Sequence, residues 1–309
     1  MRRVGYVAVT LLSACGEDAG ERATTPDAGP LVFAACNETA HVGTFSVELT
    51  EKYTGVQGQV FDGVAPSDVL ETLAADGNCR HVRAPIFFCD PACPVGQTCD
   101  ATGTCVRYPL AQDVGTVTVT GLLAEVEMEA LAPANYYTNP DPLPHPGFEP
   151  GADIRLQAAG GEFPAFALRG YGVEALEVDA SEVPVQSGSP VPLAWTAPDS
   201  PGPTRVRVAL NVNGHGTTAS RIACEVEDAG SFTIPEALVT SLIADGLSGF
   251  PTLTLTRLSS DAADTDLGCV ELRVQSARKI PVTIPGLVSC DGNEDCTPPE
   301  TCRSDLTCG

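Results

Sequence analysis

The chain has 309 residues, 43% of them hydrophobic, and a formal net charge of −23. This hydrophobic content is sufficient for a packed core and excludes a chain that is disordered throughout. The acidic charge argues against binding of DNA or RNA and against docking on anionic lipid head groups, because both need clustered lysine and arginine.

The first fifteen residues, MRRVGYVAVTLLSAC, predict export. Two arginines precede a short apolar run at 4–12, the pattern of a secretory signal peptide. The run is well short of the roughly 20 residues needed for a spanning helix. The ending Leu12-Ser13-Ala14-Cys15 resembles the lipobox of bacterial lipoproteins. This resemblance implies a signal peptide at 1–14 and acylation of Cys15, for example with palmitate. The alternative is an ordinary secreted protein in which Cys15 is incidental.

Residues 15–32 are the expected lipidated tether. The stretch GEDAGERATTPDAGP at 16–30 is polar and acidic, so it buries too little surface to offset its ordering entropy. Gly16 stands where an aspartate resembles an inner-membrane retention signal, and the acidic tether resembles surface-export signals. Both resemblances imply the outer membrane, with the face of that membrane left open.

The body from about 33 to 285 shows a β pattern almost throughout. Apolar and polar residues alternate in six runs, 44–49, 115–120, 153–157, 204–208, 252–256 and 270–274. A period of two places apolar side chains on one face of a sheet and polar ones on the other. The pattern predicts a mainly β fold, an antiparallel β-sandwich with a solvated face on its sheets.

Two short helices are candidates. Residues 235–243 have Pro235 in the first turn and Gly246 beyond the end. Residues 68–75 have Asp68 and Glu71 at capping-box spacing. Either segment would otherwise be an irregular loop. The proline-rich stretch 132–151 is expected to be an extended loop.

We place a division near Glu182, between a β-rich region at 33–182 and a sandwich-like domain at 183–285. In the second part, residues 191–195 and the strand from Thr204 form an expected hairpin that contains the only tryptophan. It resembles immunoglobulin-like or fibronectin-like sandwiches. The order departs from an immunoglobulin domain, because Cys224 and Cys269 both follow Trp195.

The twelve cysteines other than Cys15 predict disulfides, because an even set behind an export signal is typical of an oxidising compartment. A zinc site or thioredoxin-like centre is rejected, since no Cys-x2-Cys occurs and the modules contain no histidine. The twelve are Cys36, Cys79, Cys89, Cys93, Cys99, Cys105, Cys224, Cys269, Cys290, Cys296, Cys302 and Cys308.

Two short Cys-rich modules, at 89–107 and 286–309, form an internal repeat in which CPVGQTCDATGTC aligns with CTPPETCRSDLTC. Segments this short cannot form a hydrophobic core, so cross-links must hold them. Four cysteines allow three pairings in each module. Resemblance to small EGF-like modules implies the interleaved one, Cys89–Cys99 with Cys93–Cys105, and Cys290–Cys302 with Cys296–Cys308. Cys36–Cys79 and Cys224–Cys269 would then use the remaining four.

With its lipobox, acidic tether, β-rich body and modules such as CPVGQTCDATGTC, the chain resembles a set of bacterial, chiefly myxobacterial, lipoproteins. The segment IACEVEDAGSFTIPEALV at 222–239 resembles a recurrent segment of that set. The resemblance implies an envelope lipoprotein and supplies no activity.

Three sets of residues are candidates for chemistry. Asp291, Asn293 and Asp295 have calcium-loop spacing, but cysteines stand where the loop needs glycine and glutamate, which favours an acidic turn. The four histidines, His41, His81, His145 and His215, show no metal-binding spacing, and no Gly-x-Ser-x-Gly elbow occurs. A triad or carboxylate pair assembled from scattered residues keeps a hydrolase as an alternative.

The loop at 132–151 carries Tyr136, Tyr137, His145 and Phe148. Exposed aromatic side chains on a sandwich would stack on sugar rings, and a loop of this length is often functional. The alternative is that they hold the loop against the body.

These patterns together predict a non-enzymatic, outer-membrane, lipid-anchored protein without a cofactor and with a structural or binding role. Its expected partners are the membrane, through the lipid, and an envelope protein or polysaccharide, with no nucleic acid. A glycan- or protein-binding module and a hydrolase are the alternatives.

Overall fold

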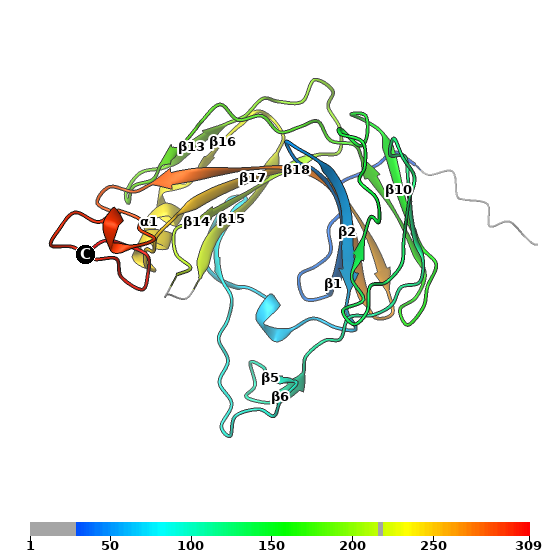
Figure 1. Ribbon diagram of the computed structural model, residues 1–309, viewed down its shortest axis with the longest axis horizontal. Coiled ribbons are helices and arrows are strands. Elements are labelled where there is room, and N and C mark those ends of the chain that lie inside the picture. The colour runs from blue at the N-terminus through cyan, green and yellow to red at the C-terminus, as the bar shows by residue number, and fades with distance from the viewer. Residues whose placement is uncertain (1–28, 216–218) are drawn as a thin grey trace, which may run out of the picture. The chain divides into compact units, whose positions relative to one another are not determined.

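The computed structural model describes residues 29–215 and 219–309 (Figure 1). The expected signal peptide, Cys15 and the tether up to residue 28 lie outside the described residues. Within the described ranges, no helix has the length and apolar character to cross a bilayer.

A ten-stranded sheet is the largest element, and we call it the large sheet. Its strands are antiparallel neighbours except that β1 and β12 both run parallel to β18. The order is β3 (Glu71–Asp76), β4 (Cys79–Arg83), β15 (Ser220–Glu227), β14 (Arg205–Asn211), β17 (Thr252–Thr265), β18 (Gly268–Thr283), β1 (His41–Leu49), β2 (Thr54–Val60) and β9 (Tyr137–Thr138), with β12 (Val183–Pro184) beside β18.

The other regular elements of the described residues are three smaller sheets, one α-helix and two 3₁₀ turns. The four-stranded sheet has the order β11 (Phe166–Tyr171), β10 (Asp153–Ala158), β7 (Val117–Thr120) and β8 (Val126–Met128). The two-stranded sheets are β13 (Val191–Ala194) with β16 (Ser231–Ile234) and β5 (Gln97–Cys99) with β6 (Cys105–Arg107). The helices are α1 (Glu236–Ala244) and the 3₁₀ turns η1 (Pro66–Asp68) and η2 (Asn293–Asp295).

The mainly β prediction is confirmed. Each of the six alternating runs contributes to a strand, namely β1, β7, β10, β14, β17 and β18. The helix expected at 235–243 is α1, which begins after Pro235 and ends before Gly246.

One face of the large sheet is covered by two hydrophobic cores. In the first core, Phe45 and Val274 of the large sheet pack with Leu156 and Leu168 of the four-stranded sheet. In the second core, Leu255 packs among side chains from α1, β13 and β16. The alternate side chains of the same strands therefore point to the opposite face, where those of β1, β2 and β18 are mainly polar.

The helix expected at 68–75 is wrong. Residues 66–68 form one 3₁₀ turn, and 71–76 form β3, the edge strand beside β4. A tight turn at Gly77 (φ +56°) joins β3 to β4, and Arg83 bonds to Glu71 across the hairpin. Cross-strand pairing therefore outweighs the capping-box pattern.

The hairpin expected between 191–195 and Thr204 is also wrong. β13 pairs with β16, whereas β14 lies between β15 and β17. Val191 and Leu193 of β13 are buried in the second core, where they cover the large sheet instead of extending it. The large sheet also crosses the expected division at Glu182, because β4 pairs with β15 and β1 with β18.

All twelve described cysteines form disulfides, and both modules have the interleaved pairing. The two long-range bridges differ from the expectation, since they are Cys36–Cys269 and Cys79–Cys224. Cys79 and Cys224 are register partners on β4 and β15, with Cα atoms 4.1 Å apart. Cys36 precedes β1, whose first residue His41 pairs with Cys269 at the start of β18.

A buried ion pair lies beside the second core. Arg257 and Asp228 are 1% and 3% exposed, and Arg257 Nε lies 2.6 Å from Asp228 Oδ2. Trp195 Nε1 and Thr204 Oγ1 also donate to Asp228, at 2.8 and 3.2 Å. Arg257 also donates hydrogen bonds to the carbonyl oxygens of Ala175 and Thr196, at 3.1 and 2.6 Å.

We expect Asp228→Asn to lower the free energy of unfolding by about 3–5 kcal/mol, because it leaves a buried guanidinium without its counter-charge. Urea unfolding followed by fluorescence of Trp195 measures the change. Glu225→Gln is the control, since its pair with Arg207 is 40% and 29% exposed and contributes about 1 kcal/mol or less. Equal midpoints for the two variants would contradict the prediction.

Candidate functional site

The polar face of the large sheet contains a hollow of about 640 Å³, which we call the polar hollow. Its floor is formed by side chains of β1, β2 and β18 that point away from the first core. Its sides are residues around 61–68, Tyr108 with Pro109, and Tyr136. This volume is within the range of roughly 300–1,000 Å³ typical of small-molecule sites.

Three strands contribute one connected group of polar side chains to the floor. Glu48 Oε1 accepts hydrogen bonds from Gln275 Nε2 at 3.0 Å and from Gln57 Nε2 at 3.3 Å. The Tyr136 hydroxyl donates to Gln57 Oε1. These bonds fix the orientation of both amides and present the floor as a preset array of donors and acceptors.

A second group lies further along β1 and β18. Glu271 is 2% exposed, and its Oε2 accepts a bond from Arg273 Nε at 2.6 Å while its Oε1 accepts the Cys36 N–H at 2.6 Å. His41 Nε2 is 2.8 Å from Thr44 Oγ1 and 2.9 Å from Gly43 O. Burial lowers the pKa of His41, although the Glu271 carboxylate opposes that shift. Charge is thus largely paired within this group.

The residues that directly follow the first Cys-rich module supply one side of the polar hollow. Tyr108, 49% exposed, follows β6 directly. Asp62 fixes this segment, because its Oδ2 pairs with Arg107 Nη2 at 2.6 Å and its Oδ1 accepts the Leu110 N–H at 2.8 Å. Burial would raise the pKa of Asp62, but these bonds keep it below the usual carboxyl value.

Of the four loop residues considered for binding, Tyr136 alone lines the polar hollow. Tyr137 and Phe148 are 0% and 1% exposed and belong to the first core, so they hold the loop against the body. Adjacent residues in a strand point to opposite faces, which separates Tyr136 from Tyr137. His145 lies at the surface, with Nδ1 3.4 Å from Thr54 Oγ1.

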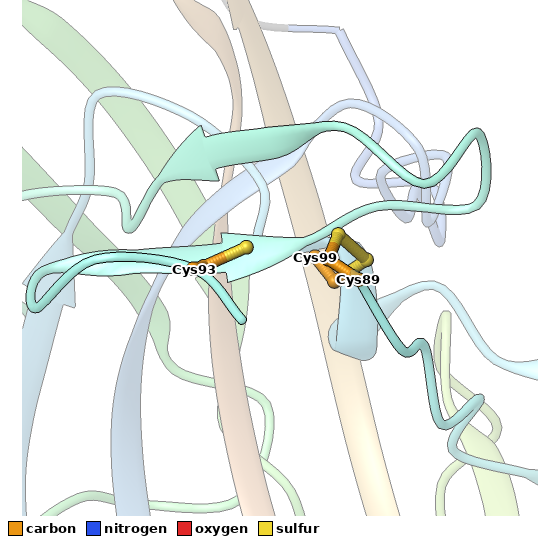
Figure 2. A group of neighbouring side chains, drawn as sticks. All are labelled: Cys89, Cys93 and Cys99. Atoms are coloured by element: carbon orange, nitrogen blue, oxygen red, sulfur yellow. A yellow bond between two sulfur atoms is a disulfide. The ribbon is translucent and has the colours of Figure 1, made fainter. Parts of the chain in front are cut away.

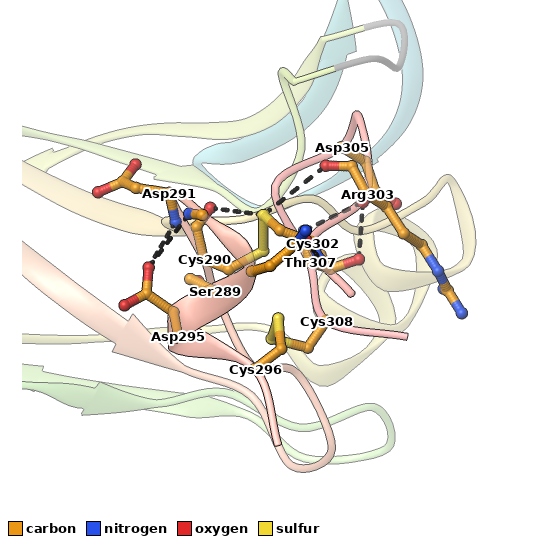
Figure 3. Close-up of a disulfide and its surroundings, with 12 residues drawn as sticks. Ser289, Cys290, Asp291, Asp295, Cys296, Cys302, Arg303, Asp305, Thr307 and Cys308 are labelled. Carbon is orange, nitrogen blue, oxygen red and sulfur yellow. Dashed lines mark hydrogen bonds between the residues drawn. A yellow bond between two sulfur atoms is a disulfide. The ribbon is translucent and has the colours of Figure 1, made fainter. Parts of the chain in front are cut away.

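Of the three calcium candidates, Asp295 and Asn293 accept backbone N–H groups of the C-terminal module with their side-chain oxygens, as Figure 3 shows for Asp295. Asp295 Oδ2 accepts the N–H groups of Asp291 and Gly292 at 2.8 and 3.3 Å. Asn293 Oδ1 accepts the Cys302 N–H at 2.9 Å. These contacts define an acidic turn.

The module sulfurs lie close together without forming a thiolate site. Cys89, Cys93 and Cys99 have sulfur atoms within 4.8 Å of one another, and Cys290, Cys296 and Cys308 do likewise. Each of these sulfurs belongs to a disulfide, as Figure 2 shows for Cys89 and Cys99. An oxidised sulfur is not the thiolate that binds metals.

His81 lies on the other side of the large sheet from the polar hollow. It is 1% exposed, with Nδ1 2.9 Å from Ser241 Oγ of α1 and Nε2 3.1 Å from Ser220 Oγ of β15. Asp245 Oδ2 is 3.8 Å from Nε2, too far for the hydrogen bond that orients a catalytic histidine. The histidine therefore connects α1 to the large sheet.

Neither protein-family models nor curated proteins give a match to this chain. The geometry of the polar hollow is therefore the basis for assigning a function. Gln57 and Gln275 lie outside the six alternating runs, so the sequence pattern did not single them out.

We expect the protein to lose stability as the pH falls from about 6.5, the usual histidine value, toward the lowered folded pKa of His81. Burial lowers the pKa of His81, despite Asp245, so the unfolded chain binds more protons in this window. His81→Asn should reduce the loss of melting temperature between neutral and mildly acidic pH. The lowered pKa of His41 accounts for part of the pH dependence that remains in this variant.

The exposed His215→Asn serves as the matched control and should leave the pH dependence unchanged. A His81→Asn variant with the full acid sensitivity of the wild type would refute this assignment.

Proposed function

We propose that this protein is an exported, lipid-anchored envelope protein that binds an uncharged saccharide in the polar hollow. The observation that carries the proposal is the floor of mutually fixed amides and a carboxylate beside two tyrosines. The role is binding without chemistry, and the anchor is an acylated Cys15 at the outer membrane.

A saccharide suits this arrangement chemically. Sugar hydroxyls both donate and accept hydrogen bonds, and Gln57, Gln275 and Glu48 offer both types from rigid strands. The rings of Tyr108 and Tyr136 provide amphipathic surfaces at the sides of the polar hollow. A small number of fixed polar groups beside aromatic surface is the usual composition of a small-molecule site.

Charge favours an uncharged ligand. Glu38, Glu48 and Asp68 line the polar hollow with Arg273, and the chain as a whole is strongly acidic. Anionic polymers would be repelled. Arg273 is occupied by Glu271, which reduces its capacity to bind a carboxylate or phosphate.

The bonding of the carboxylates supports binding over hydrolysis. A glycosidase requires two carboxyl groups that flank the scissile bond, one of which acts as a general acid. Glu48 accepts bonds from two amides, so its Oε1 is engaged in holding the floor of the polar hollow. Glu271 is buried, and its two carboxylate oxygens accept hydrogen bonds from Arg273 and from the Cys36 N–H.

The six disulfides support an extracytoplasmic location, because such bonds persist in oxidising compartments. A single acyl chain holds a protein only marginally, whereas several chains anchor it stably. A multiply acylated N-terminus would therefore keep the polar hollow in the envelope. The partners proposed are the membrane, through this lipid, and an envelope polysaccharide.

We expect Cys15→Ala to abolish lipid attachment and leave the protein unprocessed or released from the membrane fraction. Fractionation and intact-mass analysis of the expressed protein measure this. Gly16→Ala is the neighbouring control and should retain the lipid mass. A Cys15→Ala protein that is cut and membrane-bound as usual would contradict the anchor.

We expect Gln57→Ala to weaken saccharide binding by roughly tenfold, because it removes one amide and releases both Glu48 and Tyr136. Calorimetry with malto-, cello- and chito-oligosaccharides provides the probe. Gln157→Ala, an identical change on an exposed face of β10, should have no effect. Wild-type protein that binds none of these sugars would overturn the proposed function.

A further inference from the structure

We infer that the polar hollow is one end of a continuous trough that holds an extended chain of uncharged sugar units. This inference rests on the proposed function and specifies its ligand. A second depression of about 270 Å³ adjoins the polar hollow, and Glu48 and Gln57 line both. Because two residues are common to both linings, the depressions meet at these side chains.

Gly55 lines the second depression, beside the side chains where the two depressions meet. It is the register partner of Glu48 on the neighbouring strand, where any other residue would carry a side chain. A Cβ at Gly55 would lie 3.5 Å from the Tyr53 ring and 3.8 Å from Asn139 Oδ1, in ordinary van der Waals contact. A β-carbon alone therefore fits, but a larger side chain would fill the second depression.

Tyr53 stands at the far end of the trough. It is 55% exposed, lines the second depression, and also borders a further depression of about 300 Å³. Its backbone is held by Thr50, whose Oγ1 accepts the Tyr53 N–H at 3.0 Å and donates to the Tyr53 carbonyl at 2.9 Å. An exposed ring on a fixed turn can stack on a sugar, as Tyr108 and Tyr136 can at the other end.

The second depression also presents polar groups, and it carries less charge than the polar hollow. Thr138 and Asn139 are among its polar residues, and Glu48 is its only charged residue among the described lining. Asn139 Oδ1 accepts the Val56 N–H at 2.8 Å, which fixes the loop to the edge of β2. An uncharged chain would therefore meet preset hydrogen-bonding groups in both depressions.

The test measures the affinity for neutral oligosaccharides of increasing length, from disaccharide to hexasaccharide, in the series that binds the wild-type protein. We expect affinity to rise with chain length. Tyr53→Ala and Gly55→Val should weaken the hexasaccharide by roughly fivefold or more and leave the disaccharide nearly unchanged. Tyr53→Phe keeps the ring and should retain the full increase of affinity with chain length. Melting temperatures verify that the variants fold.

Two results separate this inference from the proposed function. The trough is contradicted if the hexasaccharide binds no tighter than the disaccharide, or if Tyr53→Ala leaves the increase of affinity with chain length unchanged. Either result leaves the polar hollow as a site for a short ligand. If no oligosaccharide binds, both ideas fall. If Gly55→Val fails to fold, Tyr53→Ala alone decides the matter, because Tyr53 is exposed.

Discussion

The alternating hairpin of β17 and β18 is the constraint on which the rest of the structure depends. Its strands of 14 and 16 residues are long enough for one apolar face to enter both cores. Leu253 and Ile280 are paired in the second core, and Val274 and Leu272 lie in the first. Since side chains alternate, the same hairpin must present Arg273 and Gln275 on the other face. The polar hollow is therefore a direct consequence of how the cores are built.

Where the two cores adjoin, the buried face of this hairpin becomes polar. Arg257, Ser259 and Ser276 occupy that zone, and each bonds to the backbone that passes from one core to the other. Tyr171 exchanges two bonds with Ser259, and the Leu176 N–H donates to Ser276. A segment without regular strand pairing is thus satisfied by side chains, as buried backbone groups require. The buried Asp228 carboxylate balances the one charge in this zone.

The sequence was informative where local pattern alone decides the structure. Alternation predicted six strands, and proline and glycine bounded α1. It was uninformative about which strands become neighbours, since β13 has the same pattern whether it pairs with β14 or β16. The long-range bridges were mispredicted for this reason, because Cys79 meets Cys224 only through the pairing of β4 with β15. The floor of the polar hollow has the same origin, since Glu48, Gln57 and Gln275 become neighbours only when β1 lies between β2 and β18.

The rigidity of this face supports the binding role that we propose for it. A ligand that orders flexible side chains loses about 0.5–1.5 kcal/mol for each one, whereas groups already held in place avoid that cost. Here the amides are fixed by Glu48 and Tyr136 on a sheet whose opposite face is a packed core. The first Cys-rich module has too few residues for a core of its own, so disulfides and the contacts of Asp62 hold Tyr108 in place. The residues after the module thereby give the polar hollow a stable side, and cross-linking compensates for the apolar contacts that so short a segment lacks.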